Sequence, residues 1–163
     1  MKKFELTNEF ITNMFGTKLF RIRALVEFGD VEAGELGGYV EKESNLGHDD
    51  NAWVYDNAWV YGNARVYGDA QVSGDARVCG NGDYAYAHGF GSVNRTTTFF
   101  RLKDGGVGVR CGCFYGTLAQ FRDKIRETHG ETKKAQEYLM LADLMELRFE
   151  EDENEVGNRK YVE

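Results

Sequence analysis

Five consecutive six-residue units run through the chain: Asn51-Ala-Trp-Val-Tyr-Asp56, Asn57-Ala-Trp-Val-Tyr-Gly62, Asn63-Ala-Arg-Val-Tyr-Gly68, Asp69-Ala-Gln-Val-Ser-Gly74 and Asp75-Ala-Arg-Val-Cys-Gly80. The alanine and the valine of a unit are two residues apart, so in an extended segment both point to the same side. Gly-Asn and Gly-Asp pairs bend the chain at the unit boundaries, because these residues tolerate left-handed backbone angles. We therefore expect short strands that bend at each boundary, with residues about 18 apart stacked on successive coils.

This repeat predicts a mainly β fold built on a short left-handed parallel β-helix over residues 51 to about 86. Five units supply fewer than two coils of three units, and a coil buries its core only against its neighbours. The flanking segments must therefore complete the core. Residues 18–25 alternate as a strand, and residues 34–46 resemble degenerate coil.

The C-terminal half of the chain has a different pattern. Two β-rich runs, 96–102 and 107–114, flank a Lys-Asp-Gly-Gly turn and predict a β-hairpin. Thr117-Leu-Ala-Gln120 is a capping box that opens one helix, and a second helix is expected from about Thr132 to Phe149. The predicted organisation has four parts: N-terminal strands and degenerate coil that cap the β-helix (1–50), the repeats (51–95), the hairpin with two helices (96–149), and an acidic mobile tail (150–163).

Composition narrows the kinds of partner. The net charge is −7, which disfavours direct binding to nucleic acid or anionic membrane and suits a basic protein partner. No apolar run approaches the roughly 18 residues of a membrane span, and the charged start Met1-Lys-Lys-Phe-Glu-Leu-Thr lacks an apolar signal core. Three cysteines make a poor disulfide framework and suit a reducing compartment, so we expect a cytoplasmic protein.

The histidines are the candidate catalytic residues of the chain. Many proteins with six-residue repeats are acyltransferases that use a histidine base, and His88, just after the repeats, is the only plausible base here. No carboxylate partner for it is evident, and no phosphate-binding or Ser/His/Asp motif is visible. We therefore expect no catalytic residue, and keep acyl transfer through His88 as an alternative.

A metal site is a second hypothesis. Cys111-Gly-Cys113 places two thiols close together, and in a strand both would face one side. Zinc needs further ligands, of which His129 is the nearest in sequence, ahead of His88, His48 and Cys79. The alternative is that both cysteines pack as small hydrophobic residues.

Aromatic and arginine side chains occupy the outward positions of the repeat. A β-helix wall bearing them would be an exposed patch of the kind that marks interfaces. The alternative is that the C-terminal hairpin and helices cover this wall. An unpaired coil end would also favour a homodimer. The predicted partner-binding residues are Trp53, Tyr55, Trp59, Tyr61, Arg65 and Tyr67.

Three stretches resemble a hexapeptide-repeat family of small proteins encoded by phages and prophages of Gram-positive bacteria. They are residues 21–30 with Gly34-Glu-Leu-Gly-Gly-Tyr-Val-Glu-Lys-Glu-Ser-Asn-Leu46, the repeats themselves, and Cys111-Gly-Cys-Phe-Tyr-Gly-Thr117 followed by Thr128-His-Gly130. The resemblance implies a phage accessory protein, and such proteins of this size and acidity are often counter-defence factors.

The function that we predict is therefore non-enzymatic inhibition of a host defence component. The specific expectation is an anti-CRISPR that blocks DNA engagement by a Cas9-type nuclease in the cytoplasm of a bacterial host. The alternatives are the acyltransferase, a structural oligomer, and a small-molecule sponge for a signalling nucleotide, which would need a basic, aromatic-lined pocket between subunits.

Overall fold

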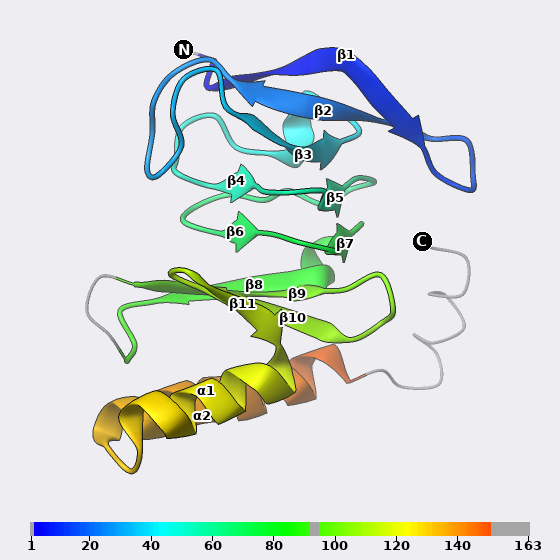
Figure 1. Cartoon of the computed structure of the whole chain (residues 1–163). Coiled ribbons are helices and arrows are strands. Elements are labelled where there is room, and N and C mark those ends of the chain that lie inside the picture. The colour runs from blue at the N-terminus through cyan, green and yellow to red at the C-terminus, as the bar shows by residue number, and fades with distance from the viewer. Residues whose placement is uncertain (1, 92–94, 151–163) are drawn as a thin grey trace.

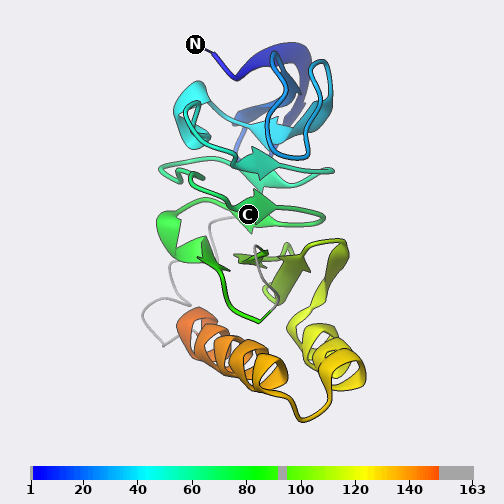
Figure 2. The same cartoon turned by 90° about the vertical axis from the view of Figure 1, so that its left-hand side faces the viewer.

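The computed structural model describes residues 2–91 and 95–150, which are arranged in layers along one long axis (Figure 1). An N-terminal hairpin lies at one end, the repeat strands follow, and a second sheet and two helices lie at the other end. A view turned by 90° shows the same order of layers (Figure 2). Of the predicted tail, only Glu150 is among the described residues.

The first sheet is mixed and has the order β1-β2-β3-β5-β7. Its first three strands pair antiparallel, and β5 and β7 then add in parallel. The N-terminal hairpin thus continues directly into the repeats. The strands are β1 (Phe4–Thr12), β2 (Lys18–Ala24), β3 (Leu36–Val40), β5 (Trp59–Val60) and β7 (Arg77–Val78).

The remaining repeat strands, β4 (Trp53–Val54) and β6 (Gln71–Val72), form a two-stranded parallel sheet of their own. Val54 pairs with Val72, and Val60 pairs with Val78 in the first sheet, so both pairs join residues eighteen apart. The unit at 63–68 contributes no strand, and its Val66 makes a single isolated bridge to Leu46.

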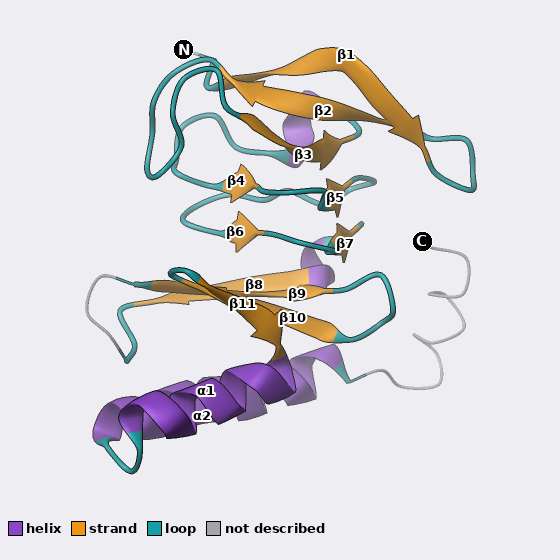
Figure 3. Cartoon of the chain, in the orientation of Figure 1, coloured by secondary structure: helices purple, strands orange, loops and turns teal. Residues whose placement is uncertain are grey.

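The predicted fold class, a left-handed parallel β-helix, is wrong. The described residues form three separate sheets, two of which contain antiparallel pairs, together with two α-helices (Figure 3). The physical reason is the shortness of the repeat. Each repeat strand has two residues, and the third unit has none, so the repeats cannot form continuous faces. The flanking antiparallel strands determine the sheets instead.

The inward positions of the repeat are confirmed as core. Every alanine and valine of the five units is at most 1% exposed, and all ten belong to one hydrophobic cluster. Aspartates at the bends then join successive layers: the Asp50 carboxylate accepts a hydrogen bond from the Gly68 amide, and that of Asp56 accepts one from Gly74. Each of these bonds also spans eighteen residues. Short 3-10 helices lie at Glu43–Asn45 and Asn81–Asp83.

The third sheet separates the repeats from the helices. It is antiparallel with the order β11-β10-β9-β8. Phe100 packs into the repeat core, while its neighbour Phe99 packs into a second core with the helices. Successive side chains of a strand point to opposite faces, so this strand contributes to both cores. The elements are β8 (Tyr84–His88), β9 (Thr96–Arg101), β10 (Val107–Cys111), β11 (Phe114–Thr117), α1 (Leu118–His129) and α2 (Lys133–Phe149).

Both helices begin as the sequence predicts. The Thr117 hydroxyl accepts from the Gln120 amide, and the Gln120 side chain accepts from the Thr117 amide, which completes the capping box. Thr132 caps α2 in the same way through the Ala135 amide. Both views place the helices on the far side of the third sheet from the repeats (Figures 1 and 2).

Gly38 allows β3 to approach the repeats closely. A Cβ atom added there would lie 2.5 Å from the Ala58 carbonyl oxygen and 2.7 Å from a Val54 methyl carbon. Gly38→Ala is therefore expected to lower the free energy of unfolding by about 1–3 kcal/mol through overpacking. Urea unfolding measures this change in the free energy of unfolding. Gly82→Ala is the matched control, because a Cβ on Gly82 meets nothing within 4 Å; equal stability of the two variants would contradict the prediction.

Candidate functional site

The predicted partner-binding set divides into buried and exposed members. Trp53 was predicted on an outward face, but its side chain is 0% exposed. Phe28 packs edge-on against its ring at 5.3 Å between centroids, and Phe4 does so at 6.4 Å. Trp53 is buried because the N-terminal segment, rather than the C-terminal hairpin, covers this part of the wall.

Three further members have partners within the chain. The Arg77 guanidinium lies 3.8 Å from the centroid of Trp59, which also contacts Tyr61 edge-on. Arg110 of β10 lies 3.9 Å from the centroid of Tyr55, so the C-terminal hairpin does cover that residue. These side chains contribute to internal packing, and their part in partner binding stays a prediction.

Arg65 and Tyr67 are the exposed members of the set, Tyr67 at 56%. Both line a groove of about 730 Å³ beside the bend at residues 43–50. We call it the Tyr67 groove. Its lining residues are Glu43, Ser44, Leu46, Gly47, His48, Asp49, Asp50, Arg65, Tyr67 and Asn81.

The carboxylates of the Tyr67 groove differ in their availability. Asp50 is held by the buried ammonium of Lys3 at 3.2 Å, and burial lowers the pKa of Lys3 while Asp50 partly opposes that shift. Glu43 forms exposed pairs with Lys2 and His48, which contribute little stability. Asp49 is exposed and makes no ion pair with any described residue. Asp49 and Glu43 are therefore the carboxylates that a ligand can reach.

A second hollow of about 350 Å³ adjoins the groove. It shares Tyr67 and Asn81 with the groove and is also lined by Tyr84, Tyr86 and Arg148. Tyr84 donates to the Arg65 carbonyl at 2.5 Å, and burial raises its pKa to about 12, so this hydroxyl stays neutral. Tyr67 thus stands between an acidic hollow and one lined by tyrosines.

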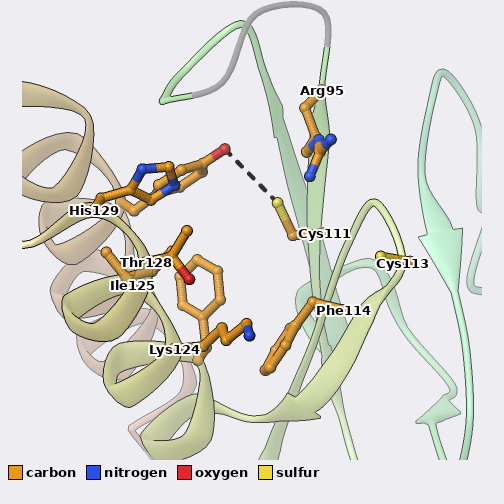
Figure 4. Close-up of a pocket in the computed structure, with 10 residues that line it drawn as sticks. Arg95, Cys111, Cys113, Phe114, Lys124, Ile125, Thr128 and His129 are labelled. Atoms are coloured by element: carbon orange, nitrogen blue, oxygen red, sulfur yellow. Dashed lines mark hydrogen bonds between the residues drawn. The ribbon is translucent and has the colours of Figure 1, made fainter.

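The three predicted metal ligands lie in a different part of the molecule. Cys111, Cys113 and His129 all line one pocket of about 130 Å³ between the β10–β11 turn and α1 (Figure 4). We call it the Cys111 pocket. Its other lining residues are Arg95, Phe114, Phe121, Lys124, Ile125, Thr128 and Tyr138.

The two thiols do not share a strand face, contrary to expectation. Cys111 ends β10 and pairs with Phe114, so Gly112 and Cys113 form the hairpin turn, with Gly112 at φ +60°. Cys111 is buried, and its sulfur accepts a hydrogen bond from the Thr97 hydroxyl at 3.2 Å. Its thiol also faces the Tyr138 hydroxyl at 3.9 Å (Figure 4). Cys113 is exposed.

No group of three or more His, Cys, Asp or Glu side chains among the described residues is placed to hold a metal ion. Zinc binding by Cys111, Cys113 and His129 therefore stays a prediction. The sequence reasoning missed Arg95 and Lys124, which line the same pocket. Helical spacing was the signal for Lys124: residues 121, 124, 125, 128 and 129 share one face of α1.

His88, the candidate base for acyl transfer, lies exposed at the end of β8. Its Nδ1 atom is 2.8 Å from the Thr96 hydroxyl of the adjacent strand. The structure thus gives His88 a hydroxyl partner across the sheet, and no described carboxylate pairs with it.

Comparison with known proteins identifies no family. No protein-family model matches the chain, and no curated protein matches it. Within residues 2–91 and 95–150, no helix has the length and apolar character needed to cross a membrane.

Proposed function

We propose that the chain is a non-enzymatic binding protein that inhibits a host defence component by protein–protein contact at the Tyr67 groove. The observation that supports this is the exposure of Tyr67, which lines two hollows, and of Arg65, which lines the one that Glu43 and Asp49 also line. Tyrosine and arginine are among the residues that dominate the energy of interfaces.

A basic protein segment is the occupant with matching chemistry. Two reachable carboxylates, Glu43 and Asp49, line the groove against the guanidinium of Arg65, and the whole chain has a net charge of −7. Complementary charge speeds association and disfavours acidic partners. A nuclease that binds DNA has such a basic surface. The narrower proposal, an anti-CRISPR directed at a Cas9-type nuclease in a bacterial cytoplasm, rests on the resemblance to phage proteins.

A pull-down tests this partner. Tagged full-length protein is mixed with a purified Cas9-type nuclease at about 0.05 and about 0.15 M salt, because surface electrostatics weaken as the Debye length shortens. Recovery at both concentrations, with loss of DNA binding by the nuclease, supports the proposal. Absence of recovery at both would overturn the assignment to this nuclease.

A homodimer remains part of the proposal, and α2 offers the surface for it. Met140, Leu144 and Leu147 recur at spacings of four and three residues, opposite the buried face of the helix. Over about one heptad that spacing matches the seam between paired helices, so we propose that a second copy covers this stripe.

Leu144→Glu is expected to convert the dimer into a monomer, because a charge would be buried in the seam. Light scattering coupled to size exclusion would show the mass falling from twice the chain mass to 18.5 kDa. Leu36→Glu is the control: Leu36 and Leu144 are both 53% exposed, but Leu36 lies on β3. A native chain that is already monomeric at the highest concentration would refute the dimer.

A further inference from the structure

We propose that the Cys111 pocket binds the phosphate group of a small phosphate monoester. Three side chains that bear or can bear positive charge line it: Arg95, Lys124 and His129. No carboxylate is among its lining residues, although acidic residues outnumber basic ones in the chain by 27 to 20. A concentration of positive charge in an acidic protein points to an anionic ligand.

The charge of the ligand follows from the permanent cations. Arg95 and Lys124 both line the pocket, and neither pairs with a carboxylate among the described residues. A phosphate monoester carries a charge of about −1.5 to −2 near neutral pH, which matches two cations. A carboxylate would leave one of them unmatched. The same two cations oppose a divalent metal ion through direct repulsion.

The Arg95 side chain has a defined support. A Cβ atom on Gly112 would lie 2.8 Å from its Nη1 atom, so the guanidinium rests against the glycine backbone of the β10–β11 turn. Lys124 and His129 both belong to α1, and Figure 4 shows Arg95 on the opposite, strand side of the pocket. Guanidinium groups bind phosphate oxygens through two parallel hydrogen bonds, and the Thr128 hydroxyl on the pocket wall can donate another.

Size and lining define the rest of the ligand. A volume of about 130 Å³ is below the roughly 300–1,000 Å³ of sites that enclose drug-sized molecules. The pocket therefore admits the phosphate and the first atoms of its substituent. Phe114, Phe121 and Tyr138 give it aromatic walls, which favour a flat apolar substituent next to the phosphate.

The test is calorimetric titration of the full-length protein with phenyl phosphate and, separately, with inorganic phosphate. At about pH 8 both are dianionic. The expected Kd for phenyl phosphate is about 1 mM or lower, and several-fold lower than for inorganic phosphate because only the ester contacts the aromatic walls. Absence of binding, or an ester that binds no tighter than inorganic phosphate, would overturn the proposal.

Paired variants localise the site. Arg95→Gln with Lys124→Gln is expected to weaken phenyl phosphate binding at least about tenfold. Arg126→Gln with Lys134→Gln removes the same charge from exposed positions outside the pocket and should leave the Kd unchanged. All four side chains are exposed, so folding should survive, and circular dichroism checks this. Equal weakening in both pairs would show that overall charge, not the pocket, binds the ester.

Metal analysis tests whether zinc, rather than a phosphate monoester, occupies the Cys111 pocket. Elemental analysis of the purified protein should find no stoichiometric zinc that depends on the thiols. Zinc at one ion per chain that is lost on replacing Cys111 and Cys113 with serine would overturn the phosphate assignment, because the cations of the pocket would then surround a metal centre.

Discussion

Trp53→Ala is expected to lower the free energy of unfolding by about 3–5 kcal/mol, the range for removing a buried tryptophan. The side chain is 0% exposed and packs against Phe4 and Phe28. A Cβ on Gly37 would lie 2.7 Å from its ring, so β3 has little freedom to fill the space left behind. Urea unfolding followed by far-UV circular dichroism measures the change.

The control for Trp53 is Tyr67→Ala. Tyr67 is also an aromatic residue of the repeat, but it is 56% exposed and outside the repeat core. Its truncation should change stability by no more than about 0.5 kcal/mol. If both variants unfolded at the same urea concentration, the Trp53 side chain would not be part of the hydrophobic core.

The period of the repeat predicted which side chains point inward. The alanines and valines of the five units recur at a fixed spacing, and all ten are buried. Local alternation determines this, because successive side chains of an extended segment point to opposite sides. The eighteen-residue pairing of Val54 with Val72 follows from the same period.

The period could not predict what lies outside the repeat wall. Trp53 points outward from its own unit, yet Phe4 and Phe28, far away in sequence, cover it. Arg65 has the equivalent position in its unit and remains exposed. Exposure of outward positions depends on long-range packing of the flanks, which the repeat does not encode. The sheet arrangement depends on those flanks too, which is why the predicted fold class was wrong.

The sequence likewise predicted only part of the lining of the Cys111 pocket. Cys111, Cys113 and His129, from the Cys-x-Cys and His-Gly segments, line one pocket, and their role as metal ligands stays a prediction. The turn at Gly112 and Cys113 altered their geometry, because a strand reversal moves the second thiol off the strand face. Arg95, the residue before β9, also lines the pocket. Nothing in its local sequence marks it, so the cationic lining emerges only from the folded chain.

Tyr67→Ala is also expected to weaken binding of the Cas9-type nuclease by about 30- to 1,000-fold, which corresponds to about 2–4 kcal/mol at an interface anchor. Tyr67 lines both hollows and is the exposed aromatic residue of the predicted set. Biolayer interferometry with immobilised nuclease measures Kd, and the loss should appear mainly in the dissociation rate, as is usual for interface truncations.

The matched control for partner binding is Phe15→Ala. Phe15 is 57% exposed, close to the 56% of Tyr67, but it lies on the turn after β1 and lines neither hollow. It should bind the nuclease as the native chain does. Asp49→Asn should instead slow association and reduce its salt dependence, because that carboxylate steers a basic partner. Equal loss from Phe15→Ala and Tyr67→Ala would move the contact away from the groove, and an unchanged Kd in Tyr67→Ala would refute the groove as the interface.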